Sequence, residues 1–164
     1  LTASRSGEVL GAKWDEIDIE KAVWTVPAYR MKARREHRVP LSPRALEILT
    51  QLDQTRLSDF VFPGTRTGSA QSNMTLTKLL RRMGRSETVH GMRSAFRDWA
   101  GDQTTFSREV AEAALAHSIG NATEQAYRRS DALEKRRELL TAWENFLFAD
   151  ASANVVPLKT REVI

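Results

Sequence analysis

Apolar residues recur along this chain at the three- and four-residue spacing that places side chains on one face of a helix. Two of these stripes are the clearest, one formed by Met92, Ala95, Phe96 and Trp99 and one by Leu133, Leu140, Trp143 and Leu147. Shorter stripes follow the same rule elsewhere. Helices are therefore predicted to start near Ser6, at Ser42-Pro43, before Leu76, at His90, at Ser107 and at Asp131.

Polar and conformationally special residues mark where several of these helices begin and end. Proline follows Ser42 at the first helical position, where its missing N–H has no partner to lose. Gly84 comes directly after the stripe that ends at Met83, which is typical of a helix C-terminus. Asp131 and Glu134 have the spacing of a capping box, so these two side chains are predicted to cap the last helix.

Three short stretches have the composition of strands instead. They run from Trp14 to Ile19, from Ala22 to Val26 and from His37 to Leu41. Glu20 and Lys21 are placed to turn the first hairpin, and Pro27 ends the second strand. The connection over residues 28–36 is long and basic. The chain is predicted to fold as a mostly helical α+β domain with one small three-stranded antiparallel sheet.

The composition limits the classes of protein to which this chain can belong. Its 164 residues are 41% hydrophobic and 28% charged, which suits one domain with its own core. No run of about 18 apolar residues and no signal-peptide pattern is present, so no membrane span is predicted and a cytoplasmic location is expected. Cysteine is absent, which excludes disulfides and thiolate metal sites.

Arginine dominates the charge of the chain. The formal net charge is only +4, yet 19 arginines stand beside six lysines. This excess has two interpretations, the codon usage of a GC-rich genome or a polyanionic partner such as nucleic acid. Composition does not decide between them.

The stretch from His90 to Tyr127 carries the chemistry. It places His90-x-x-Arg93, then His117, then Tyr127 along one segment. Arginine offers two parallel donors to phosphate oxygens, histidine moves protons near neutral pH, and a tyrosine hydroxyl can act as a nucleophile. His117 also has a purely structural interpretation, as a residue that satisfies the carbonyl groups at a helix end.

Cofactor chemistry has little support in the sequence. The three histidines lack the paired spacing of a metal site, and no carboxylates cluster with them. No glycine-rich phosphate cradle is present either. We therefore expect phosphoryl transfer without a metal, a nucleotide or any other cofactor.

Six local motifs, taken together, resemble the catalytic domain of the tyrosine recombinases, and in particular the phage-type integrases of prophages and genomic islands. They are RSGEVL, WDEID, HRVPL, HGMRSAFRDWA, EAALAHS and AYRR. The resemblance implies the catalytic set Arg5, Lys32, His90, Arg93, His117 and Tyr127. It also implies that residues 1–148 are a catalytic domain without its first helix and its upstream DNA-binding domain. Residues 149–164 are expected to form a tail that is flexible or docks on a partner.

The resemblance further implies a mechanism for these residues. Tyr127 would attack the scissile phosphate and form a 3′-phosphotyrosine link, while Lys32 protonates the leaving 5′ oxygen. Arg5 and Arg93 would hold the non-bridging oxygens. His90 would assist proton transfer, and His117 would hydrogen-bond the phosphate. Arg34 and Arg35 lie in the same basic connection, so the register that assigns Lys32 to this role is open.

Two departures and two rival functions accompany the resemblance. Ala116 stands where the family often has glycine, and Tyr127 follows His117 by ten positions, slightly more than is common. The rivals are a type IB topoisomerase and a catalytically inactive DNA-binding module. The implied partners are double-stranded DNA at attachment sites, other integrase protomers in a tetramer, and accessory DNA-bending or directionality proteins. No membrane is implied.

Overall fold

A three-stranded antiparallel sheet forms early in the chain, in the order β1-β2-β3. The computed structural model describes residues 1–117 and 131–149. Strand β1 spans Ile17–Asp18, β2 spans Val23–Val26 and β3 spans His37–Pro40. The central strand pairs on both sides, with Trp24 opposite Ile17 and also opposite Val39. The predicted sheet is thus confirmed, and so is the α+β class.

The first strand is shorter than the sequence pattern predicts. Residues Trp14–Glu16 form a turn of 3-10 helix instead of strand. The Glu16 carboxylate accepts a hydrogen bond from the backbone N–H of Lys13 at 3.3 Å, which closes this turn. A short helix, α1, precedes it at Ser6–Leu10.

Within residues 1–117 and 131–149 five longer helices follow, and most of them begin where the sequence predicts. They are α2 (Pro43–Gln54), α3 (Met74–Arg82), α4 (Val89–Asp102), α5 (Arg108–Ala114) and α7 (Leu133–Phe148). Pro43 opens α2, and Gly84 has a φ of +70° just beyond α3, the left-handed conformation that glycine adopts most easily. These two boundary predictions are confirmed.

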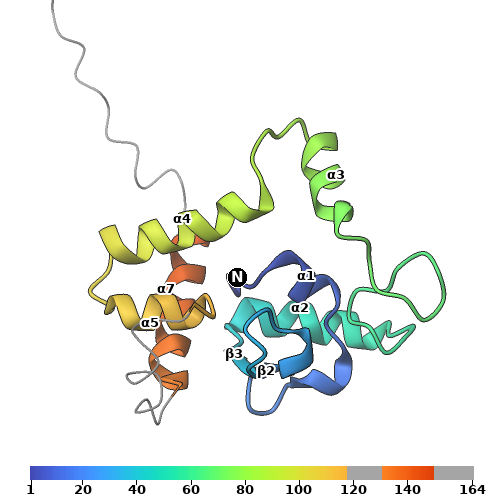
Figure 1. The fold of residues 1–164 in the computed structure, drawn as a ribbon, viewed down its shortest axis with the longest axis horizontal. Coiled ribbons are helices and arrows are strands. Elements are labelled where there is room, and N and C mark those ends of the chain that lie inside the picture. Colours follow the sequence, from blue (N-terminus) through green and yellow to red (C-terminus); the bar gives the residue numbers. More distant parts are fainter. Residues whose placement is uncertain (118–130, 150–164) are drawn as a thin grey trace, which may run out of the picture.

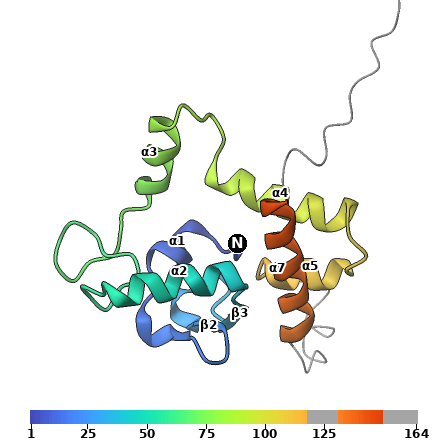
Figure 2. The ribbon, with the colours of Figure 1, turned by 180° about the vertical axis from the view of Figure 1, so that it is seen from behind.

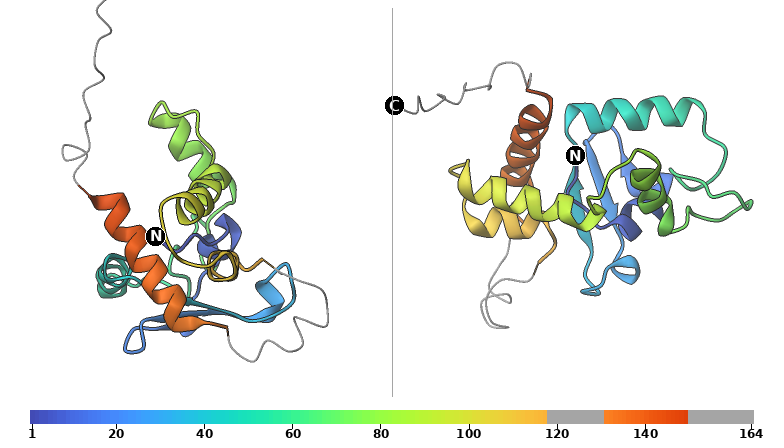
Figure 3. Two further views of the ribbon diagram at one scale, coloured as in Figure 1. Left: turned by 90° about the vertical axis from the view of Figure 1, so that its left-hand side faces the viewer. Right: turned by 90° about the horizontal axis from the view of Figure 1, so that it is seen from above.

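Figure 1 shows two groups of elements, and buried side chains from both groups form one core. The sheet, α1 and α2 form one group, and α4, α5 and α7 form the other. Helix α7 lies against both α5 and strand β3, so it joins the two groups (Figure 2). Helix α3 projects away from the body, as the side view in Figure 3 also shows, and none of its residues is buried.

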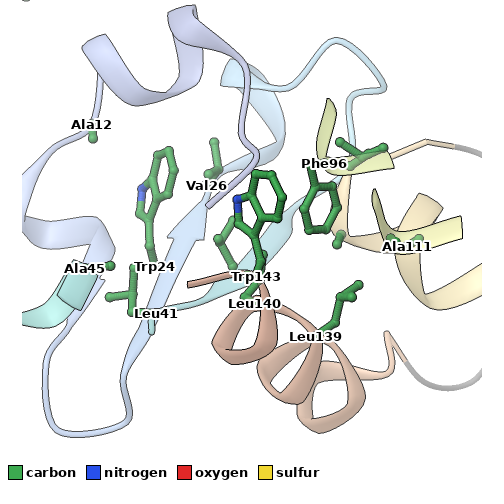
Figure 4. Close-up of a cluster of buried hydrophobic side chains, with 14 of the residues drawn as sticks. Ala12, Trp24, Val26, Leu41, Ala45, Phe96, Ala111, Leu139, Leu140 and Trp143 are labelled. Atoms are coloured by element: carbon green, nitrogen blue, oxygen red, sulfur yellow. The ribbon is translucent and has the colours of Figure 1, made fainter. Parts of the chain in front are cut away.

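Aromatic side chains fill the centre of this core (Figure 4). Phe96 and Trp143 meet edge to face at 5.5 Å between ring centroids, and Trp99 lies 5.0 Å from Trp143. Rings in such arrangements contribute dispersion and quadrupole attraction beyond the area that they bury. Because Phe96 comes from α4 and Trp143 from α7, these contacts fix the helix that carries Arg93 against the rest of the domain.

The predicted buried faces of two helices are partly wrong. On α4 the buried residues are Arg93, Phe96, Trp99 and Ala100, whereas Met92 is 50% exposed. On α7 Leu147 is 45% exposed, and an arginine, Arg136, is buried at 1%. A prediction from hydrophobic spacing assigns only apolar side chains to the core, so it does not identify a buried arginine. An arginine is tolerated there because distant backbone carbonyl groups accept its hydrogen bonds.

Arg136 joins the start of α7 to strand β3. Its guanidinium donates to the backbone carbonyl oxygens of Asp131 and Arg38 and to the Asp131 carboxylate, the last at 3.0 Å. Arg38 binds the same carboxylate with two bonds of 2.9 Å. Asp131 is not the N-cap of α7, contrary to the prediction. The N-cap is Ala132, in the left-handed conformation with a φ of 52°.

Replacement of Arg136 by methionine is expected to lower the free energy of unfolding by about 3 kcal/mol, because buried carbonyl groups lose their donors. The methionine keeps the apolar stem, so the change isolates the guanidinium. Lys135→Met is the matched control, since Lys135 is exposed on the same helix. Its expected effect is within about 0.5 kcal/mol. Urea unfolding of both variants measures the difference, and equal stability would refute the structural role of Arg136.

Candidate active site

Among the predicted site residues that the structure describes, Arg93 and His117 contact each other through their side chains. Arg93 lies in the second turn of α4 and is 7% exposed. Its Nη2 stands 3.4 Å from Nε2 of His117 and donates to the carbonyl oxygen of Leu115 at 2.9 Å. Its Nη1 donates to the carbonyl oxygen of Ala3. These backbone acceptors hold the guanidinium plane in one orientation.

His117 follows α5 directly, and a carboxylate holds its other ring nitrogen. Nδ1 lies 2.6 Å from Oε2 of Glu112, and the His117 backbone N–H donates to the carbonyl oxygen of Glu112 at 2.9 Å. The preceding residue, Ala116, has a φ of 52°, in the region that favours glycine. This conformation agrees with the glycine that the resemblance leads us to expect at this position.

Arg5 forms the N-terminal boundary of α1 and stands beside Glu8. Its Nη1 contacts Oε1 of Glu8 at 2.9 Å, and its backbone N–H donates to Oε2 at 2.8 Å. The pKa of Arg93 lies below its usual value, chiefly because of burial and secondly because of the positive charge of Arg5. The positive charges of the two guanidinium groups therefore repel each other. The Glu8 carboxylate partly offsets this repulsion, and an anionic ligand beside Arg93 would offset it further.

His90 and Lys32 are both exposed side chains. His90 lies one turn before Arg93 on α4, so the two share a side of the helix. Lys32 lies in the connection between β2 and β3. No hydrogen bond or ion pair within residues 1–117 and 131–149 joins either side chain to the Arg93–His117 pair. Arg34 and Arg35 are exposed as well, so the general-acid position among these three stays a prediction.

Arg30 fixes the base of the connection that carries Lys32. It forms an ion pair with Glu16 and donates to the carbonyl oxygen of Glu8 in α1. Because Glu8 also pairs with Arg5, the connection and Arg5 are anchored to one helix. Met31, beside Lys32, is 3% exposed and adds a hydrophobic anchor.

The predicted nucleophile, Tyr127, lies outside the described residues. The chain before it is fixed at His117, and the chain after it is fixed at Asp131 by Arg38 and Arg136. Tyr127 lies four positions before Asp131, and an extended chain of that length reaches at most about 14 Å. Its role as nucleophile stays a prediction.

Three polar residues near this site were not identified as site residues by the sequence analysis. Glu8 is 6% exposed and pairs with Arg5. Glu112 is equally buried, and nothing in its spacing from His117 marks it. His37, on β3, has its pKa lowered to about 4 by burial and by the charge of Arg136, so its ring is neutral at pH 7.

This arrangement has the chemical character of an anion site with proton donors and acceptors nearby. Two guanidinium groups supply positive charge, and an imidazole presents its Nε2 beside one of them. Groups of three metal-ligating side chains are absent from the part of the chain that the structure describes. Helices long and apolar enough to cross a membrane are likewise absent from those residues.

Comparison with known proteins gives consistent results. The profile described as "Phage integrase family" matches residues 1–134. "Prophage integrase IntA" of Escherichia coli (strain K12) is 38% identical over 160 residues, which cover 95% of this chain and 38% of that protein. "Integrase" of Enterobacteria phage P4 is 34% identical over 166 residues, with 90% and 38% of the two chains covered. The chain thus spans well under half the length of these curated relatives.

A solved structure described as "Crystal structure of XerA recombinase" is also similar. It is 16% identical to this chain, with a TM-score of 0.42, and the match covers 90% of this chain and 54% of that one.

Proposed function

This chain belongs to the phage integrase family, and we propose that it is the catalytic part of a site-specific DNA recombinase that cuts and rejoins DNA strands during integration or excision of a mobile element. The observation that carries the proposal is the buried guanidinium of Arg93, oriented by two backbone carbonyl groups and facing Nε2 of His117. A guanidinium has five N–H donors, and those that are not bound to the two carbonyl oxygens suit the non-bridging oxygens of one phosphate.

The proposed reaction is a transesterification. The Tyr127 oxygen attacks phosphorus, the bond from phosphorus to the 5′ oxygen breaks, and Lys32 gives that oxygen its proton. Arg5 and Arg93 stabilise the charge on the non-bridging oxygens, and His117 hydrogen-bonds the same group. His90 assists the transfer of the tyrosine proton. The phosphotyrosine bond conserves the energy of the broken phosphodiester, so a 5′-hydroxyl can reverse the reaction without a cofactor.

The wider organisation follows as part of the same proposal. Residues 1–148 form the catalytic domain, whose last described helix ends at Phe148. Residues 149–164 form a tail. The proposed partners are double-stranded attachment sites, further integrase protomers in a tetramer, and accessory DNA-bending or directionality proteins.

A strand-exchange assay tests the proposal against the rival functions. The protein is incubated with two duplexes that carry the attachment sites of the element, one of them labelled. Recombinant products of predicted length support an integrase. Relaxation of supercoils without exchange between duplexes favours a topoisomerase, and binding without any covalent step favours an inactive DNA-binding module.

DNA binding by this chain is expected to weaken steeply as salt rises, because phosphate contacts dominate it. Helix α3 projects from the body and carries Lys78, Arg81 and Arg82 on its exposed surface. Changing Arg81 and Arg82 together to glutamine should lower the slope of log K against log salt by about 2. Titrations by fluorescence anisotropy at several salt concentrations measure this slope.

Lys21→Gln is the control for that slope. Lys21 is exposed, but Asp18 pairs with it at 2.7 Å, so its charge is already balanced. Its loss should leave the slope unchanged. If the double variant also keeps the slope of the unmodified protein, α3 does not contact the DNA backbone.

A further inference from the structure

Glu112 is a buried carboxylate with a different partner on each oxygen. It lies on α5 and is 6% exposed. Oε2 stands 2.6 Å from Nδ1 of His117, and Oε1 accepts a hydrogen bond from Nε of Arg97 at 2.8 Å. Arg97 belongs to α4, the helix of Arg93. A single carboxylate thus connects the imidazole to the helix that carries the buried guanidinium.

The charge state of Glu112 determines which ring nitrogen of His117 carries a proton. Burial by itself favours the neutral acid, but the hydrogen bonds from Arg97 and His117 outweigh it, and the pKa of Glu112 lies below its usual value. An ionised carboxylate only accepts hydrogen bonds. Nδ1 of His117 must therefore donate, and in the neutral ring Nε2 is left as an acceptor.

The position of Arg93 agrees with this tautomer. Nη2 of Arg93 lies 3.4 Å from Nε2, which is a long distance for a hydrogen bond. A lone pair on Nε2 can accept the N–H of Nη2 across this distance. In the opposite tautomer Nε2 would carry the proton, so two N–H donors, one from Arg93 and one from His117, would face each other. Nδ1 would then present a lone pair to the Glu112 carboxylate, and two acceptors would face each other. Glu112 and Arg93 thus select the same arrangement from opposite sides of the ring.

We propose that Glu112 is a positioning residue of the reaction, which holds the His117 ring through Nδ1 so that Nε2 faces the phosphate beside Arg93 and, when it carries a proton in the imidazolium form, donates to a phosphate oxygen. This inference rests on the proposed recombinase function. It extends the catalytic set by a residue that touches neither substrate nor reacting atoms. The competing interpretation is that Glu112 only pairs with Arg97 and braces α5 against α4.

Two measurements separate these roles. The first is NMR of the ring nitrogens in ¹⁵N-histidine-labelled protein over a pH series, since the chain has only three histidines to assign. The second is the single-turnover rate of covalent cleavage of a nicked attachment-site duplex by the full-length protein. The variants are Glu112→Gln, His117→Ala and the double change, with Glu138→Gln, an exposed position on α7, as the control. Glutamine keeps the shape of the buried side chain, and thermal unfolding checks that each variant folds.

If Glu112 positions the ring, Glu112→Gln shifts the nitrogen signals of His117 away from the Nδ1–H tautomer and slows cleavage by about a hundredfold, as small misplacements of catalytic groups do. Added to His117→Ala, the same change causes no further loss, because its target is gone. The control keeps the unmodified rate.

Three results would overturn the inference. One is unchanged His117 signals in Glu112→Gln, another is cleavage at the unmodified rate, and the third is a full additional loss in the double variant. A protein that forms no covalent adduct in any version instead contradicts the recombinase function. In that case the ring-nitrogen spectra still decide whether Glu112 fixes the tautomer.

Discussion

Replacement of Arg93 by lysine is expected to slow covalent DNA cleavage by about a hundredfold or more, while DNA binding is largely kept. Lysine preserves the positive charge but has a single donor centre instead of a planar fork. It cannot bind the carbonyl oxygens of Ala3 and Leu115 and still place two parallel donors on a phosphate. The loss should therefore appear in the chemical step, where charge builds on the non-bridging oxygens.

The experiment separates chemistry from folding. Arg93 is buried and ties α4 to two distant backbone positions, so its loss also costs stability. Single-turnover cleavage is measured well below the melting temperature of each variant, with anisotropy binding in parallel. Arg44→Lys, an exposed arginine on α2 that pairs with Glu47, serves as the control. A folded Arg93→Lys protein that cleaves at the unmodified rate would remove Arg93 from the site.

Replacement of Tyr127 by phenylalanine is expected to abolish the covalent adduct and leave DNA affinity unchanged. The change removes one oxygen, which is the proposed nucleophile, and no charge. Because binding depends mainly on basic side chains and phosphates, the salt dependence should also stay the same. Cleavage is followed on a nicked duplex whose short 5′-hydroxyl strand diffuses away, so that the phosphotyrosine link cannot be reversed.

Tyr29→Phe is the matched control, because the chain has only two tyrosines. Tyr29 is 67% exposed and lies in the short 3-10 turn Ala28–Arg30 after strand β2. Its variant should form the adduct at the unmodified rate. An adduct that survives in Tyr127→Phe and disappears in Tyr29→Phe would reassign the nucleophile.

Local sequence patterns predicted the helix boundaries better than the buried faces. Pro43 and Gly84 act through their own backbone preferences, which no distant residue can change. The orientation of α4 and α7 in the core depends instead on their partners. Arg93 and Arg136 are buried because carbonyl groups from Ala3, Leu115 and Arg38 meet them, and these residues lie more than twenty positions away.

The same distinction applies to the site. Arg5, Arg93 and His117 were predicted from motifs, and the structure places Arg93 and His117 side by side with the charge of Arg5 nearby. Glu112 was missed because a glutamate on a short helix is ordinarily a solvated residue. The left-handed turn at Ala116 brings His117 back toward the helix, where its ring becomes the second partner of this carboxylate beside Arg97.

Mapping the covalent adduct is the most direct test of the proposed function. The full-length protein is incubated with the nicked attachment-site duplex in EDTA and without nucleotide, then digested, and the DNA-linked peptide is sequenced by mass spectrometry. The proposed mechanism predicts a 3′-phosphate ester on Tyr127, formed equally well without divalent metal. A link to any other residue, or an adduct that forms only when metal is restored, would contradict it.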